Sequence, residues 1–164
     1  MNKISHFLKI VISLSSLFTF GISADFELDK IITDANKTNR QVMLFLHKDG
    51  CGFCEKMIFD LEDENISRTI DKNFIFVDIN RDDDENVSFL GYEGSNGDFL
   101  KKLDIDLYPT TLFIDTNNSF VYNIIGYRNK KTLMTILNYV GSKSYKEQTF
   151  EEFKDELLGD DEED

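Results

Sequence analysis

The stretch that decides the fold of this chain runs from residue 42 to residue 54 and reads Val42-Met43-Leu44-Phe45-Leu46-His47-Lys48-Asp49-Gly50-Cys51-Gly52-Phe53-Cys54. Its first five residues are apolar without polar alternation, a pattern typical of a strand buried on both faces of a sheet. The only two cysteines of the chain follow as Cys-Gly-Phe-Cys, where the strand gives way to a helical pattern. Their position predicts a pair of sulfurs at the start of a helix.

The start of a helix favours the thiolate form of cysteine, because unpaired backbone N–H groups and the positive end of the helix dipole lie there. We expect Cys51 to face solvent and to be the attacking thiolate. Cys54, one turn further along, is expected to be shielded and to resolve a mixed disulfide. Gly52 and Phe53 stand between the sulfurs and carry no charge, so the helix end would be the chief stabiliser of the thiolate.

Apolar residues on either side of this stretch alternate between helical and strand spacing. The pattern predicts a helix over 26–38, a strand over 42–46, a helix in two pieces through 70 with Asn65 as the cap between them, strands over 74–79, 110–115 and 119–127, a short helix over 98–104, and a last helix that Gly141 ends. Residues 81–97, with an acidic run and three glycines, predict a long surface loop. This order predicts an α/β fold with a central mixed sheet of about four strands and helices on both faces.

The chain resembles thioredoxin-fold proteins over nearly all of residues 26–140. The resemblance rests on Cys-Gly-Phe-Cys after the first strand and on Tyr108-Pro109-Thr110 before the third. Pro109 is the only proline of the chain, and in this family that proline is cis and packs opposite the cysteine pair. The stretches Ser88–Tyr92 and Gly126-Tyr127, with the late Tyr145, are most similar to secreted bacterial thioredoxins of the SoxW-like kind.

The resemblance implies a thiol–disulfide oxidoreductase that acts on protein or small-molecule disulfides and exchanges electrons with a redox partner protein. It implies that Pro109 shapes the site and that the backbone around Tyr108 pairs with an extended substrate. Gly126 matches a family glycine that substrate backbone approaches closely, although a turn residue at a strand end is an equal alternative. No organic cofactor and no metal are implied.

Three positions depart from the usual thioredoxin pattern. Phe45 stands where thioredoxins carry a buried acid, Gly50 stands where they carry tryptophan, and Tyr108 precedes the proline in place of a small or β-branched residue. Two other functions stay open from the sequence. One is a copper(I) metallochaperone that uses Cys51 and Cys54, with or without His47, because soft thiolates select that ion. The other is a non-catalytic binding module that retains the fold.

The ends of the chain predict export and an acidic tail. Residues 1–24 have Lys3 and Lys9, a short apolar run and small residues before Asp25, as in a signal peptide, and so predict a periplasmic or secreted protein. An uncleaved anchor is the alternative, because Ile22 is large for its place before a cleavage site. We therefore divide the chain into a signal peptide (1–24), a thioredoxin-like domain (25–146) and a C-terminal segment (147–164).

The C-terminal segment has apolar residues at helical spacing and a strongly acidic composition. Phe150, Phe153, Leu157 and Leu158 predict an amphipathic helix over 147–158, which we expect to dock on the body of the protein. The whole chain has a formal net charge of −13. This charge argues against nucleic acid and anionic membrane surfaces as partners.

Overall fold

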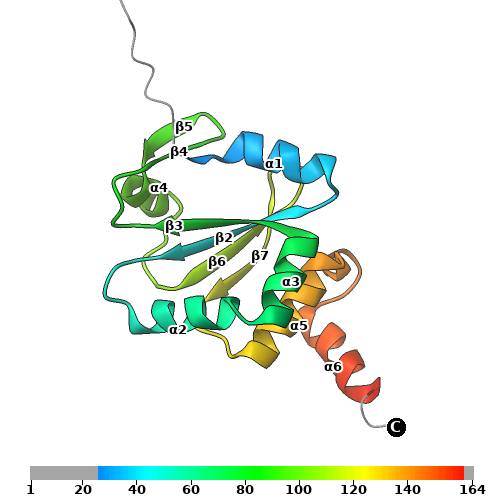
Figure 1. Cartoon of the computed structure of the whole chain (residues 1–164). Helices are drawn as coiled ribbons and strands as arrows, with labels where there is room; N and C mark the ends of the chain where they lie inside the picture. Colours follow the sequence, from blue (N-terminus) through cyan, green and yellow to red (C-terminus); the bar gives the residue numbers. More distant parts are fainter. Residues whose placement is uncertain (1–25, 161–164) are drawn as a thin grey trace, which may run out of the picture.

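The computed structural model describes residues 26–160, so the signal peptide predicted for residues 1–24 lies outside the described residues. The elements are β1 (Phe26–Glu27), α1 (Leu28–Lys37), β2 (Gln41–His47), α2 (Gly52–Leu61), α3 (Glu64–Asn73), β3 (Phe74–Asn80), β4 (Asn86–Phe89), β5 (Tyr92–Ser95), α4 (Asn96–Lys102), β6 (Thr110–Ile114), β7 (Phe120–Ile125), α5 (Lys130–Gly141), a 3-10 turn (Ser144–Lys146) and α6 (Phe150–Asp160). Figure 1 shows a central sheet with helices above and below it.

The central sheet has four strands in the order β3-β2-β6-β7. Strands β2 and β3 are parallel, whereas β2 pairs antiparallel with β6 and β6 pairs antiparallel with β7. The expected mixed sheet of about four strands is therefore confirmed. In its register Leu46 pairs with Thr110, and Thr110 pairs with Ile125. The end of β2, the start of β6 and the end of β7 thus lie side by side at one end of the sheet.

The side chains of β2 divide between two hydrophobic cores, one on each face of the sheet. Val42, Leu44 and Leu46 pack with residues of α1 and α4, while Met43 and Phe45 pack with residues of α2, α3 and α5. Every residue from 42 to 46 is fully buried. The absence of polar alternation in this run follows from burial on both faces.

The prediction of a long surface loop over residues 81–97 is wrong. Strands β4 and β5 form a hairpin there, and β1 adds to β4 to make a second sheet in the order β1-β4-β5. In β4, buried Val87 and Phe89 alternate with partly exposed residues, but this alternation covers only four positions. The connecting residues Leu90 and Gly91 have φ values of 49° and 78°, as a two-residue type I′ turn requires. Leucine is rarely found in such a turn, which concealed the hairpin in the sequence.

A smaller correction concerns the boundary between α2 and α3. Asn65 was expected to cap the second helix, but the N-cap residue is Asp63. The Asp63 carboxylate accepts a hydrogen bond of 3.1 Å from the backbone N–H of Asn65. Asn65 is therefore a donor within the first turn, and α3 begins earlier than predicted.

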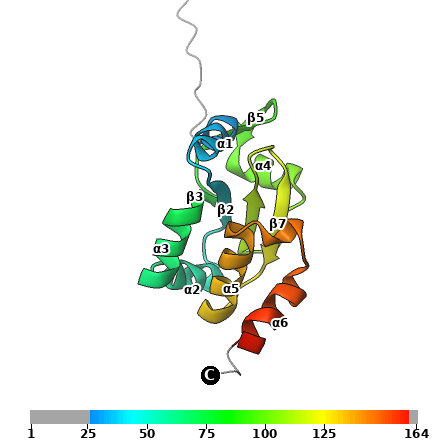
Figure 2. The same cartoon turned by 90° about the vertical axis from the view of Figure 1, so that its right-hand side faces the viewer.

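Helix α6 packs on the body of the protein through its aromatic residues. The ring of Phe150 lies 5.9 Å from that of Tyr122 and 5.5 Å from that of Tyr139, and the ring of Phe153 lies 5.3 Å from that of Tyr139. Figure 2 shows α6 beside α5. The helix begins at Phe150, three residues later than expected. Within residues 26–160, no helix has the length and apolar character needed to span a membrane.

Candidate active site

The two cysteines form a disulfide at the start of α2. Their sulfurs are 2.05 Å apart and their Cα atoms 5.2 Å apart. Cys51 is the N-cap residue, and its Sγ accepts a hydrogen bond of 3.2 Å from the backbone N–H of Cys54. Its carbonyl oxygen accepts hydrogen bonds from the backbone N–H groups of Cys54 and Glu55 at 2.9 and 3.0 Å. The Cys51 sulfur therefore lies where the helix end supplies N–H donors and a favourable dipole.

The two cysteines differ in their exposure to solvent. Cys54 is 1 % exposed and belongs to the buried face of α2 with Met57 and Leu61, whereas Cys51 is partly exposed. A reagent from solvent therefore meets Cys51 first. The attacking role of Cys51 and the resolving role of Cys54 stay predictions.

Phe53, between the cysteines, projects into solvent and contacts a residue from beyond β7. Its side chain is 65 % exposed, and its ring stacks on that of Tyr127 with centroids 6.3 Å apart. The Tyr127 hydroxyl donates a hydrogen bond of 2.7 Å to Oδ2 of Asp60 on α2. Asp60 is the only buried acid among the described residues. The contact between Tyr127 and Asp60 is not predicted by the sequence; its one signal there is the place of Asp60 on the buried face of α2.

The bond between Tyr108 and Pro109 is cis and directly precedes β6. Pro109 is buried, and its carbonyl oxygen accepts a hydrogen bond of 2.7 Å from the backbone N–H of Gly126. Because Thr110 pairs with Leu46, these residues lie at the end of the sheet where β2 leads toward Cys51. The structure thus brings Pro109 and Gly126 together at the end of the sheet where β2 ends, four residues before Cys51.

Gly126 ends β7 with a φ of +82°, a left-handed conformation that glycine adopts without strain. A Cβ at this position would meet only Arg128 Nη1 within 4 Å, at an ordinary contact distance of 3.8 Å. The conformation therefore accounts for glycine as a strand-end residue. The close approach of substrate backbone stays a prediction.

Tyr108 is held against the body of the protein. Its hydroxyl donates a hydrogen bond of 3.1 Å to the carbonyl oxygen of Ile105, and its ring packs against the core on the α1 side of the sheet. Burial raises the pKa of the Tyr108 hydroxyl above its ordinary value. The ammonium of Lys48 lies 5.7 Å from the centre of the ring. The residue before the cis bond thus contributes an anchored ring to this region.

His47 interacts with an aspartate on the neighbouring strand. Its Nε2 lies 2.7 Å from Oδ1 of Asp78, and its ring stacks on that of Phe45 at 5.4 Å. The hydrogen bond to Asp78 raises the pKa of His47, against the opposing effect of burial. Among the described residues, no three His, Cys, Asp or Glu side chains gather in a group that could hold a metal ion.

Comparisons with known proteins bear on the fold. A family model described as thioredoxin-like domain matches residues 28–141. Among solved structures, a thioredoxin-fold protein from Helicobacter pylori has a TM-score of 0.60 and 17 % identity, over 74 % of this chain and 81 % of that chain. A thioredoxin from Thermus thermophilus has a TM-score of 0.54 and 20 % identity, over 70 % of this chain and 84 % of that chain. A DsbH oxidoreductase has a TM-score of 0.53 and 12 % identity, over 71 % of this chain and 82 % of that chain.

The comparison with curated proteins finds no match. At identities of 20 % or less, the likeness to solved structures concerns the fold alone. The family model, in contrast, spans the chain from α1 to the end of α5 and includes the disulfide and the cis bond. The chain therefore belongs to the thioredoxin-like domain family.

Proposed function

We propose that this protein is an exported thiol–disulfide oxidoreductase that exchanges disulfides with protein or small-molecule substrates through Cys51 and Cys54. The observation that carries the proposal is the asymmetry of the pair at the start of α2. Cys51 is partly exposed and its sulfur receives an N–H hydrogen bond, while Cys54, one turn later, is buried. This arrangement suits one attacking and one resolving thiol.

The reaction begins from the reduced pair. The Cys51 thiolate attacks one sulfur of a substrate disulfide, so that a bond forms between Cys51 and the substrate while the substrate S–S bond breaks. The released substrate thiolate takes a proton from solvent. Cys54 then loses its proton to solvent and attacks the Cys51 sulfur, so that the bond between Cys51 and the substrate breaks and the disulfide between Cys51 and Cys54 forms. The second substrate sulfur leaves as a thiolate and takes a proton from solvent. Two electrons pass from the cysteine pair to the substrate.

The same steps in reverse oxidise a substrate dithiol. The direction in the cell depends on the reduction potential of the pair relative to that of its redox partner protein. The exchange needs no organic cofactor, because the sulfurs carry both electrons. Export through residues 1–24 and the place among SoxW-like thioredoxins are parts of this proposal.

Other residues around the disulfide would position the substrate. Gly52 and Phe53 are exposed beside the sulfurs, and Tyr108, Pro109 and Gly126 lie where β2 and β7 end and β6 begins. In the proposed complex, an extended substrate segment pairs with the backbone around Tyr108. This pairing would place a substrate sulfur in line with Cys51.

The proposal is tested with single-cysteine variants of the full chain and insulin as the disulfide substrate. Cys54→Ala leaves the attacking thiol but removes the resolving one, so the variant should accumulate a covalent complex that reductant releases. Cys51→Ala should accumulate none. Equal trapping by both variants, or none by either, would contradict the assigned roles.

The same proteins separate this function from its two competitors. Stoichiometric copper(I) that stays on the reduced protein against a competing chelator, without turnover of insulin, would favour a metallochaperone. A disulfide that resists reduction would favour a non-catalytic binding module. Catalytic reduction of insulin would exclude the binding module.

A further inference from the structure

A group of aromatic rings and lysines lies on the outer side of α2, which begins at the disulfide, on the segment after β7 and at the start of α5. We call it the aromatic–lysine surface, and it consists of Phe53, Lys56, Phe59, Tyr127 and Lys130. Its two phenylalanines are 65 % and 69 % exposed. They fill no part of the core, so their apolar area is available for contact with another molecule.

The half of this surface nearest the disulfide is organised around Tyr127. The ring of Phe53 stacks on the Tyr127 ring at 6.3 Å, and the ammonium of Lys56 lies 4.4 Å from the centre of the same ring. The hydrogen bond from Tyr127 to buried Asp60 holds the ring from beneath. The side chains of Phe53 and Lys56 therefore both rest against the Tyr127 ring, which this hydrogen bond holds in place.

The far half contains Phe59 and Lys130. The ammonium of Lys130 lies 5.8 Å from the centre of the Phe59 ring and 2.9 Å from Oδ2 of Asp63. Lys130 therefore already has a carboxylate partner. Lys56 has no carboxylate partner among the described residues, so its ammonium is the cation that can pair with an incoming carboxylate.

The charges around Lys56 make it a local exception on an acidic protein. Helical spacing puts Glu55 and the C-cap residue Glu62 about a third of a turn around α2 from Lys56, on the side of Phe59. Asp60 lies closer to Lys56 around the helix, but it is buried and accepts the hydrogen bond from Tyr127. The whole chain has a net charge of −13. An acidic segment is thus repelled by most of the protein and attracted at Lys56, next to Cys51.

The geometry points to a specific class of substrate for the proposed oxidoreductase: we infer that the aromatic–lysine surface binds a peptide segment that carries an apolar side chain and a carboxylate next to its disulfide-bonded cysteine. The apolar side chain lies on Phe53 and Phe59, and the carboxylate pairs with Lys56. This inference rests on the proposed function, because it concerns the substrate that reaches Cys51.

The test uses two synthetic peptides of equal length, each with one cysteine in a mixed disulfide with a chromophoric thiol. One peptide has Phe and Asp beside the cysteine, and the other has Phe and Lys. The rate of chromophore release by the reduced full-length protein is divided by the rate with a small free thiol, which corrects for the intrinsic effect of the peptide charge. The corrected rate should be roughly fivefold higher for the Asp peptide, and the ratio should fall at high salt.

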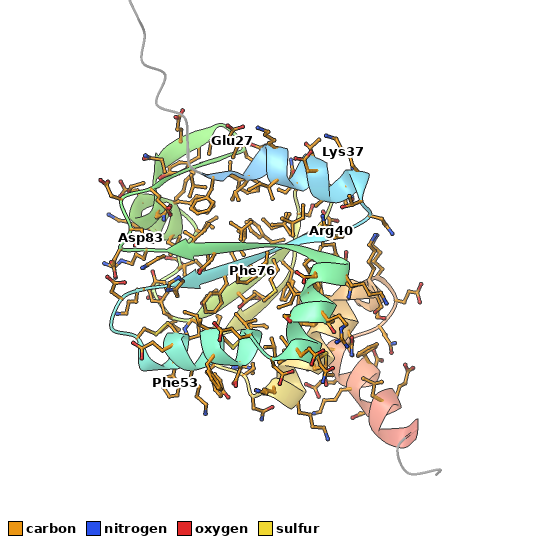
Figure 3. The ribbon with its side chains drawn as sticks, viewed as in Figure 1. Glu27, Lys37, Arg40, Phe53, Phe76 and Asp83 are labelled. Atoms are coloured by element: carbon orange, nitrogen blue, oxygen red, sulfur yellow. A yellow bond between two sulfur atoms is a disulfide. The ribbon has the colours of Figure 1, made fainter. Side chains whose placement is uncertain are left out.

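Two charge variants locate the effect. Lys56→Glu should abolish or reverse the preference for the Asp peptide. Lys37→Glu makes the same change of charge on α1, on the other side of the sheet from Phe53, and should leave the ratio unchanged (Figure 3). The readout is the ratio of the two peptides, so a general change in the reactivity of Cys51 does not affect it.

A third variant tests the apolar contact. Phe59→Ser replaces a side chain that is 69 % exposed, so the fold should tolerate it. It should slow the reaction of the Asp peptide about threefold, but not that of a peptide with Ala in place of Phe. Equal corrected rates for the Asp and Lys peptides, or an unchanged ratio in Lys56→Glu, would overturn the inference and leave the oxidoreductase intact. Release of chromophore from neither peptide would overturn the proposed function itself.

Discussion

The hydroxyl of Tyr127 donates a hydrogen bond of 2.7 Å to Oδ2 of Asp60 and thereby joins the segment after β7 to the helix that begins at the disulfide. Asp60 is only 6 % exposed, so this hydrogen bond replaces water as the partner of a buried carboxylate oxygen. The ring of Tyr127 in turn contacts Phe53 and Lys56. This hydrogen bond therefore holds the Tyr127 ring, which Phe53 and Lys56 contact, against the helix that begins at the disulfide.

Replacing Tyr127 by Phe should lower the free energy of unfolding by about 1–3 kcal/mol, because the buried Asp60 carboxylate loses its donor. Denaturant unfolding of the oxidised protein measures the change. Tyr92→Phe is the matched control, since the Tyr92 hydroxyl is buried without a hydrogen-bond partner among the described residues. Its removal should be neutral or stabilising. Equal losses in the two variants would show that the Tyr127 hydrogen bond contributes nothing specific.

In the reduced protein, an alkylating reagent supplied in limiting amount should label Cys51 at least about tenfold faster than Cys54. The reason is that Cys51 is partly exposed and receives an N–H hydrogen bond at the N-cap, whereas Cys54 is buried. Mass spectrometry of the digested protein gives the two rates. Faster labelling of Cys54 would reverse the roles assigned to the two sulfurs.

The stability that His47 gains from Asp78 should depend on pH. The hydrogen bond to Asp78 raises the pKa of His47 above its ordinary value of 6.5, so folding favours the protonated ring. This contribution is fully present below the unfolded value of 6.5 and is lost as the pH rises through the raised folded value. The measurement compares the unfolding free energies of wild type and Asp78→Asn from about pH 5.5 to about pH 8.5.

The difference in unfolding free energy between wild type and Asp78→Asn should become smaller as the pH rises. A proton NMR titration should also give a lower pKa for His47 in Asp78→Asn than in wild type. Asp83 and Asp49 keep a smaller favourable effect on the protonated ring in both proteins. A difference in unfolding free energy that stays constant with pH would show that the interaction of His47 with Asp78 contributes nothing through the charge of His47.

Phe45→Ala should lower the free energy of unfolding by about 3–5 kcal/mol, because the ring is fully buried between β2 and the helices that cover it. Phe76→Ala is the control: this ring stacks on Phe45 at 6.3 Å but is 39 % exposed. It should cost about half as much or less. Denaturant unfolding of both variants decides the comparison, and a similar loss from both would contradict a tightly packed Phe45.

The parts of the fold with a strong apolar pattern could be predicted from the sequence. The unbroken apolar run from Val42 to Leu46 has one structural explanation, burial on both faces, and it identified the central strand. The hairpin of β4 and β5 was not accessible in this way. Its strands are four residues long, its turn contains Leu90 in a left-handed conformation, and acidic residues and glycines around it are typical of a loop.

The candidate site likewise has features that the sequence predicts and features that it does not. The spacing of Cys51 and Cys54 at a strand-to-helix boundary was enough to predict a sulfur pair, because the motif is local. Tyr127 and Asp60 are separated by 67 residues, and only the packing of the segment after β7 against α2 brings them together. No local pattern reports such a contact. The same applies to His47 and Asp78, which meet because β2 and β3 pair in parallel.

The strand order of the central sheet bears on whether molecules of this protein aggregate through their edge strands. Its outer strands are β3 and β7, and an outer strand can recruit a neighbouring chain into intermolecular pairing and aggregation. Strand β3 carries Asp78, half exposed, and leads into the acidic run at 82–85, while the pairing of β6 and β7 is interrupted by a register shift. Repulsion at one rim and irregular pairing near the other should keep the sheet from growing across molecules at high concentration.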